Sequence, residues 1–223
     1  MKRVRWTRGL PLVLVFFVPL VAGADRSMYR GFQFGMDLNA AVKHSGMDMS
    51  EVITIHERPA RIQELTWNPE RFSRTSADRD PVEQVVFSFY NGELFRMVVD
   101  YDTQKIEGLS AEDLIEAVSV RYGTATRPAV KASFPSASFS EGVTVVATWE
   151  DADNSVNLVQ SPYGLRFGLI AFSKRLDALA QTAIDTGMHL DKQEAPQRQR
   201  AEEQNAQDNL NKSRLINKPR FLP

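Results

Sequence analysis

The dipeptide Asn91-Gly92 restricts the fold of this chain more than any other feature. It lies between two apolar-rich runs, residues 83–90 and 93–101, in which Val, Phe and Tyr recur. A two-residue type I′ turn needs positive φ at both positions, and Asn-Gly adopts this geometry readily. The pattern therefore predicts an antiparallel β-hairpin with the two runs as its strands.

A two-residue turn also fixes the register of the hairpin, with Phe89 opposite Leu94 and Val85 opposite Val98. An antiparallel sheet with one solvated face alternates apolar and polar residues, but here both faces are apolar. We expect one face to pack on helices and the other to be covered by the second half of the chain, by segment 210–223 or by another protein. Four residues are predicted to line this covered or contacted face: Tyr90, Phe95, Met97 and Tyr101.

Two segments predict a helix with defined ends. Asp37 is a good N-cap for a helix that Gly46 would end. Ser110, with Asp113 three residues later, approximates a capping box, and Gly123 would end that second helix. Apolar residues at helical spacing follow each cap, so both segments indicate amphipathic helices.

Each predicted helix precedes a strand that ends in Thr-Trp, residues 62–67 and 143–149. Further strands are expected over residues 51–57, 156–160 and 165–173, in addition to the hairpin. The fold class is therefore predicted to be α+β, with two helix-then-antiparallel-sheet units in tandem, residues 25–107 and 108–189.

The remaining segments predict a loop, a C-terminal helix and a tail. Residues 124–140 are rich in Ser, Ala and Pro, which favours a loop, and residues 175–184 have apolar positions at helical spacing. Residues 190–223 are expected to form a polar, largely disordered tail, because few of them could be buried. The apolar end of this tail, from Leu210 to Pro223, could instead be a recognition peptide that docks on a sheet edge or groove.

Residues 1–24 have the three parts of a secretory signal peptide. Four basic residues precede an apolar run from Leu10 to Val21, and Ala22-Gly23-Ala24 provides a cleavage site before Asp25. The apolar run is shorter than the ~20 residues of a membrane span. We therefore predict an exported protein, periplasmic or secreted, with no integral membrane segment after cleavage.

Charge and composition exclude several classes of function. The full chain has 27 basic and 28 acidic residues, so removing the four basic residues of the signal leaves a net charge of −5. This acidic balance argues against nucleic acid or anionic lipid as a partner recognised through overall charge. The absence of cysteine excludes disulfides, thiolate metal sites, cysteine nucleophiles and a lipid anchor on cysteine.

No local motif predicts a catalytic, cofactor or metal site. His44, His56 and His189 are far apart in sequence and lack the spacing of metal ligands. The acidic segment 150–155 lacks the glycine and glutamate of a calcium loop and is typical of a polar β-turn. Asp100 and Asp102 at a strand end favour solvated charges, and no nucleophile elbow or phosphate loop is present.

The order of elements resembles known envelope proteins. The Gly35-Met36-Asp37 opening, with Ala41 and Gly46, resembles the start of the small outer-membrane assembly lipoproteins of the SmpA/OmlA type. The tandem helix-plus-sheet arrangement is also similar to that of the β-lactamase inhibitor proteins. The lipidated cysteine and the usual Gly-x-Pro after the first helix are missing. The resemblance implies a fold class and a habit of binding other proteins, and it implies no site residues.

These observations predict an exported, soluble protein with a non-catalytic protein-binding or envelope-assembly role. Its partner would be another envelope protein or a second copy of itself, and no cofactor is expected. The alternative is a hydrolase with a scattered active site, which would need His56 close to Glu57 or Asp100 with a serine within reach.

Overall fold

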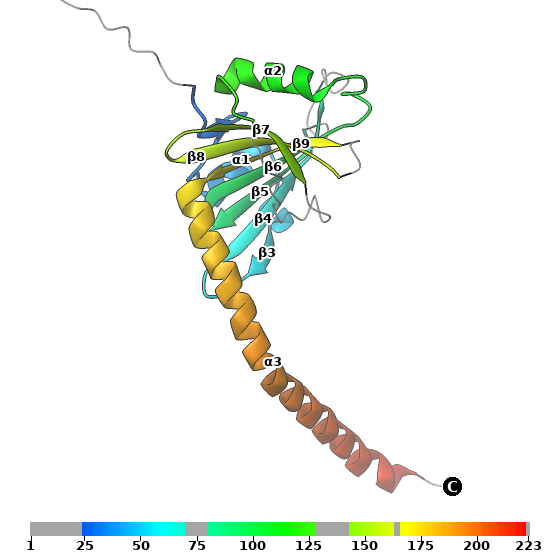
Figure 1. Cartoon of the computed structure of the whole chain (residues 1–223). Helices are drawn as coiled ribbons and strands as arrows, with labels where there is room; N and C mark the ends of the chain where they lie inside the picture. The colour runs from blue at the N-terminus through cyan, green and yellow to red at the C-terminus, as the bar shows by residue number, and fades with distance from the viewer. Residues whose placement is uncertain (1–23, 70–79, 128–142, 163–165, 222–223) are drawn as a thin grey trace, which may run out of the picture.

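The computed structural model describes residues 24–69, 80–127, 143–162 and 166–221. Its centre is a seven-stranded antiparallel sheet with the order β3-β4-β5-β6-β9-β8-β7, accompanied by a two-stranded β1-β2 sheet (Figure 1). The fold is α+β, as the sequence predicts. The signal-peptide prediction falls outside the described residues apart from Ala24, and so does most of the predicted loop 124–140.

The strands and helices follow one another in the order that the sequence predicts. The small sheet was not predicted. Its strands are β1 (Met28–Tyr29) and β2 (Phe32–Gln33). The main sheet consists of β3 (Ile53–His56), β4 (Ile62–Trp67), β5 (Val82–Tyr90), β6 (Glu93–Tyr101), β7 (Thr144–Glu150), β8 (Asn154–Gln160) and β9 (Phe167–Ser173). The α-helices in the described residues are α1 (Leu38–Ser45), α2 (Ala111–Tyr122) and α3 (Lys174–Asn217), and short 3₁₀ helices are η1 (Met49–Glu51) and η4 (Lys218–Arg220).

The β5-β6 hairpin confirms the predicted turn but corrects the predicted register. Asn91 and Gly92 both have positive φ, and Phe89 lies opposite Leu94 as expected. The next pair is Ser88 with Arg96, so Phe95 is an extra residue, a β-bulge. Beyond the bulge the register shifts by one residue, and a one-residue shift moves every later side chain of β6 to the opposite face.

The first and second halves of the chain form one continuous sheet. Strands β4-β5-β6 and β9-β8-β7 meet through the antiparallel pair β6-β9, with Val98 opposite Ile170. The last strand of one half therefore pairs with the last strand of the other. The proposal that the two halves are repeats of one unit stays a prediction.

The caps of α1 and α2 confirm the predicted helix ends. The Asp37 carboxylate accepts hydrogen bonds from the backbone N–H groups of Asn39 and Ala40, and Gly46 ends α1 in the left-handed conformation. Ser110 and Asp113 form both halves of a capping box at the start of α2. These caps satisfy N–H groups that have no partner inside the helix.

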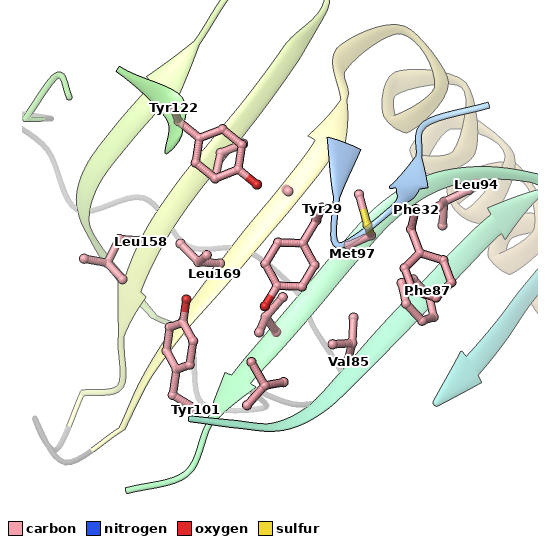
Figure 2. Packing of buried hydrophobic residues seen from close by; sticks show 14 of the residues in the cluster. Tyr29, Phe32, Val85, Phe87, Leu94, Met97, Tyr101, Tyr122, Leu158 and Leu169 are labelled. Carbon is pink, nitrogen blue, oxygen red and sulfur yellow. The ribbon is translucent and has the colours of Figure 1, made fainter. Parts of the chain in front are cut away.

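One face of the main sheet forms the principal core together with α1, α2 and the β1-β2 sheet. Figure 2 shows Phe32 over Phe87, and the two ring centroids lie 4.2 Å apart. The same cluster contains Leu65, Met97 and Leu169 from the sheet. Trp149 joins α2 to β7, because its indole N–H donates to the Gly123 carbonyl at 2.9 Å.

Helix α3 is much longer than predicted and replaces the expected disordered tail. It begins at Lys174 and continues to Asn217, although the sequence predicted a helix only over 175–184. The prediction considered burial alone, whereas Ala, Gln, Glu, Lys and Arg, which favour helix intrinsically, make up most of residues 190–217. Figure 1 shows α3 leaving the sheet and bending in its middle, where Pro196 lies inside the helix.

Candidate functional site

The four residues predicted to line one interaction face lie on opposite faces of the sheet. Met97 and Tyr101 belong to the core beneath α1 and α2, whereas Phe95 and Tyr90 pack on the other face beneath α3. The bulge at Phe95 causes this separation. Phe95 is only 2% exposed. The hypothesis of a shared interaction face through these four residues is therefore not supported by their positions.

The start of α3 covers part of the second face of the sheet, where it packs on residues of β4, β5 and β6. Leu176 and Ala180 pack on Ile62 and Phe95. Beside this contact the Arg96 guanidinium and the Asp177 carboxylate lie 2.6 Å apart, with side chains 11% and 15% exposed. Burial raises the pKa of Asp177, and the charge of Arg96 only partly offsets that effect. The cover that the sequence required is thus partly the chain's own C-terminal helix.

The structure does not bring together His56 and Asp100, one of the two pairs on which a hydrolase site could be built. His56 lies on the edge strand β3 and Asp100 on β6, three strand spacings or about 14 Å across the sheet. His56 is in register with Glu93 of β6, so Asp100 lies a further seven residues, or about 23 Å, along that strand. Asp100 is buried and accepts a hydrogen bond from the Gln84 amide at 2.7 Å. His44 packs edge-on against Phe32, and within the described ranges no group of three His, Asp or Glu residues could hold a metal ion.

The acidic segment 150–155 forms the turn between β7 and β8. The Asp151 carboxylate accepts hydrogen bonds from the backbone N–H groups of Asp153 and Asn154, at 2.9 and 2.7 Å. Lys174 approaches both Glu150 and the Asp151 carbonyl. These carboxylates therefore organise a hairpin turn and the start of α3.

Three tyrosines contribute hydroxyl groups to the principal core. Tyr29, Tyr101 and Tyr122 lie around one region of it in Figure 2, and the Tyr122 hydroxyl donates to the Met28 carbonyl at 3.1 Å. Burial raises the pKa of Tyr29 to about 12 and that of Tyr101 well above its usual value. These phenols stay neutral at physiological pH, so they cannot act as phenolate bases or nucleophiles there.

The contacts between α3 and the sheet end near residue 194. A Cβ atom at Gly187 would lie 2.8 Å from the Arg58 carbonyl oxygen, so this glycine permits the close approach of α3 to the β3-β4 loop. Arg58 also pairs with Glu194, and one of its hydrogen bonds measures 3.0 Å. Every residue from Ala195 to Phe221 is exposed.

Large apolar side chains are exposed at the end of α3 and just beyond it. We call this segment, Leu210–Phe221, the helix tip. Leu215 is 75% exposed and Phe221 is 78% exposed, and Leu210 and Ile216 are also exposed. The tip carries four basic residues, Lys212, Arg214, Lys218 and Arg220, and no acidic residue. It therefore combines exposed apolar surface with positive charge.

A second group of exposed apolar side chains lies at the β3 edge of the sheet, and we call it the edge patch. It consists of Met49, Ile53 and Ile55, of which Ile53 is 61% exposed. Within the described part of the chain no strand pairs with the outer side of β3. The opposite edge differs, because Thr126 and Thr148 exchange backbone hydrogen bonds along β7.

Over the residues that the structure describes, the helix tip and the edge patch are the two places where large apolar side chains gather on the surface. Of the eleven large hydrophobic residues that are exposed in the described part of the chain, four belong to the tip and three to the patch. The others are dispersed, and single exposed hydrophobic residues are normal on protein surfaces. The sequence predicted the apolar tip, and it missed the patch because exposure of a strand depends on its position in the sheet.

Comparison of the chain with protein-family models, with curated proteins and with solved structures finds no match. Among the described residues, none of the helices is both long enough and apolar enough to cross a membrane. The functional interpretation therefore depends on the surfaces of this molecule.

Proposed function

We propose that this chain is an exported, non-catalytic protein-binding protein that uses α3 as its interaction element. One observation carries the proposal: α3 extends far beyond its last contact with the sheet and ends in exposed apolar side chains. An isolated polar helix gains little from tertiary burial, and exposing Leu215 and Phe221 to water is unfavourable. A partner that covers the tip would bury these apolar side chains and would give the end of α3 the tertiary contacts that it lacks.

An envelope location and an assembly role are part of this proposal. The signal-like residues 1–24 support export, and the resemblance of the Gly35–Gly46 opening to envelope-assembly lipoproteins supports a role in binding other proteins. The hydrolase alternative with His56 beside Asp100 finds no support, because these two residues lie on strands three positions apart.

The proposal is tested by capturing partners of the tagged, exported protein after chemical cross-linking and identifying them by mass spectrometry. The test variant is Leu215→Asp with Ile216→Asp, because both side chains are exposed and their replacement removes no core contact. The matched control is Val120→Asp, which changes a residue that is 87% exposed on α2, far from the tip in sequence.

We expect a specific cross-linked protein that the tip variant loses and the Val120→Asp control keeps. A cross-linking pattern that is identical for all three proteins would contradict the proposal. Phe95→Asp is unsuitable as an interaction probe, because Phe95 is buried beneath α3 and the substitution would test stability instead.

A further inference from the structure

We infer that the helix tip binds the edge patch of a second copy of this chain, so that the protein forms a twofold symmetric dimer. This inference rests on the proposed function, because it names the partner of the same helix tip. Three independent observations support it: the charges of the two surfaces, the reach of α3 and the open edge of the sheet.

The two surfaces carry opposite charges. Residues 47–57, which contain the edge patch, include the acidic residues Asp48, Glu51 and Glu57 and no lysine or arginine. The β3-β4 loop that follows adds two basic residues, Arg58, which pairs with Glu194, and Arg61. After the signal is removed, the chain has a net charge of −5. The helix tip contributes +4 to this sum, so residues 25–209 have a net charge of −9. A positively charged apolar segment is thus attached to a negatively charged body, and complementary charge of this kind favours association.

The arrangement of α3 prevents the tip from reaching the patch of its own chain. Among the described residues, the last contact between α3 and the body is the Arg58–Glu194 pair, and Leu210 follows 16 residues later. At 1.5 Å per helical residue this places the start of the tip about 24 Å beyond that contact. The tip therefore meets an edge patch only when another molecule supplies it.

A twofold axis would let each tip contact the edge patch of the other copy, so that two identical tip–patch contacts form together. Two α3 helices that run antiparallel about residues 200–204 would bring each tip beside residues 187–194 of the other copy. These residues contact the β3-β4 loop, so each tip would lie near the partner's edge patch. In this arrangement Arg200 of one copy would also lie near Glu203 of the other, and paired contacts double the area that a single contact buries.

The edge patch can receive apolar side chains of the tip. A hollow of about 460 Å³ opens beside the patch, and its lining combines Met49, Pro59 and Ala60 with polar side chains that include Glu57 and Arg61. Ile53 and Ile55 stay exposed next to the outer side of β3, with which none of the described strands pairs. Exposed apolar edge strands of this kind invite association, and natural proteins usually cover them or protect them with charge.

Sedimentation equilibrium of the purified chain, residues 25–223, over a wide range of concentration tests this inference. The wild-type chain is expected to dimerise, and salt should weaken the dimer. One variant reverses the tip charge with Arg214→Glu and Lys218→Glu. A second variant reverses the patch charge with Glu51→Lys and Glu57→Lys. Each should raise the dimer dissociation constant about tenfold per reversed residue.

Mixing the two variants should restore the dimer, because each reversed surface then meets a surface of opposite charge on the other chain. Circular dichroism checks that both variants keep their helix content. A wild-type chain that stays monomeric, or a dimer that neither variant weakens, overturns the inference. Binding of the monomeric wild-type chain to anionic phosphatidylglycerol vesicles through the tip would also overturn it.

The failure of this inference can be distinguished from failure of the proposed function. If the purified chain stays monomeric while cross-linking still captures another protein through Leu215 and Ile216, only the self-association is wrong. If the tip variant changes neither the cross-linked partners nor the oligomeric state, both proposals fail.

Discussion

Burial of Tyr29 couples the stability of this fold to pH. The ring lies in the principal core between β1 and the main sheet, and it is 8% exposed. Burial disfavours the phenolate, which raises the pKa of Tyr29 to about 12 from an ordinary value near 10. The unfolded chain therefore loses this proton at lower pH than the folded chain does.

The free energy of unfolding should consequently fall as pH rises from 10 to 12. Below pH 10 the tyrosine is neutral in both states and contributes no pH dependence. Between these values the loss attributable to Tyr29 is about 2 to 3 kcal/mol. Urea unfolding at a series of alkaline pH values measures this loss, and Tyr29→Phe should make the decline shallower. A variant that declines as steeply as the wild type would contradict the assignment.

Asp177 is the residue whose removal should most weaken the attachment of α3. It pairs with Arg96, whose charge persists at all relevant pH values, and both side chains are largely buried. Asp177→Ala leaves this guanidinium without its carboxylate, and we expect a loss of about 3 kcal/mol in the free energy of unfolding. Chemical denaturation measures this loss, with Asp185→Ala on the exposed side of α3 as the control.

If Asp177→Ala and Asp185→Ala lowered the free energy of unfolding by the same amount, the Arg96–Asp177 pair would contribute little to stability. The pKa of Asp177 is raised mainly by burial, so the pair is not an ordinary surface ion pair. Its location between the sheet and α3 is what makes the substitution informative.

Gly187 determines how closely α3 approaches the β3-β4 loop. Glycine to alanine inside a helix usually stabilises it by about 1 kcal/mol. Here a Cβ atom would lie 2.8 Å from the Arg58 carbonyl, so helix or loop must move. We predict that Gly187→Ala increases amide hydrogen exchange across residues 184–194, while the exposed substitution Thr186→Ala does not.

Unchanged exchange in Gly187→Ala would mean that α3 touches the loop less closely than the backbone geometry indicates.

The β5-β6 hairpin gives a second example of an element whose packing depends on one residue. The bulge at Phe95 puts Phe95 beneath α3 and Met97 on the opposite face. No feature of the strand pattern distinguished Phe95 from its neighbours, because both faces of the hairpin are apolar.

For the whole molecule, stability should depend on the first part of α3 and not on its end. Leu176 and Ala180 are buried against the sheet, whereas every residue from Ala195 to Phe221 is exposed. Deletion of residues 195–223 should therefore shift the thermal midpoint of the monomer by no more than about 2 °C. Deletion of residues 174–223 should instead expose Ile62 and Phe95 and cause aggregation or unfolding.

Differential scanning calorimetry at low protein concentration measures both midpoints, and low concentration avoids any contribution from association. A large drop for the shorter deletion would contradict the view that the end of α3 is a projecting element. An unchanged midpoint for the longer deletion would contradict the assignment of α3 as a cover for the sheet.

The sequence alone determined the local structure of this protein. The caps at Asp37 and Ser110, the Asn91-Gly92 turn and the order of strands depend on residues close in the chain, and the structure confirms them. The hydrophobic pattern also showed that both faces of the hairpin needed a cover. The length of α3 was missed because its polar half depends on intrinsic helix propensity, which burial arguments ignore.

Only the tertiary structure decided which strands meet, which face each residue of β6 occupies and what covers each face. The β6-β9 pairing, the shift at Phe95 and the packing of Leu176 on Ile62 join residues far apart in sequence or depend on a single inserted residue. An edge strand and a buried strand can also have the same composition. The exposure of Ile53 and Ile55 follows from the place of β3 in the sheet, which local interactions do not encode.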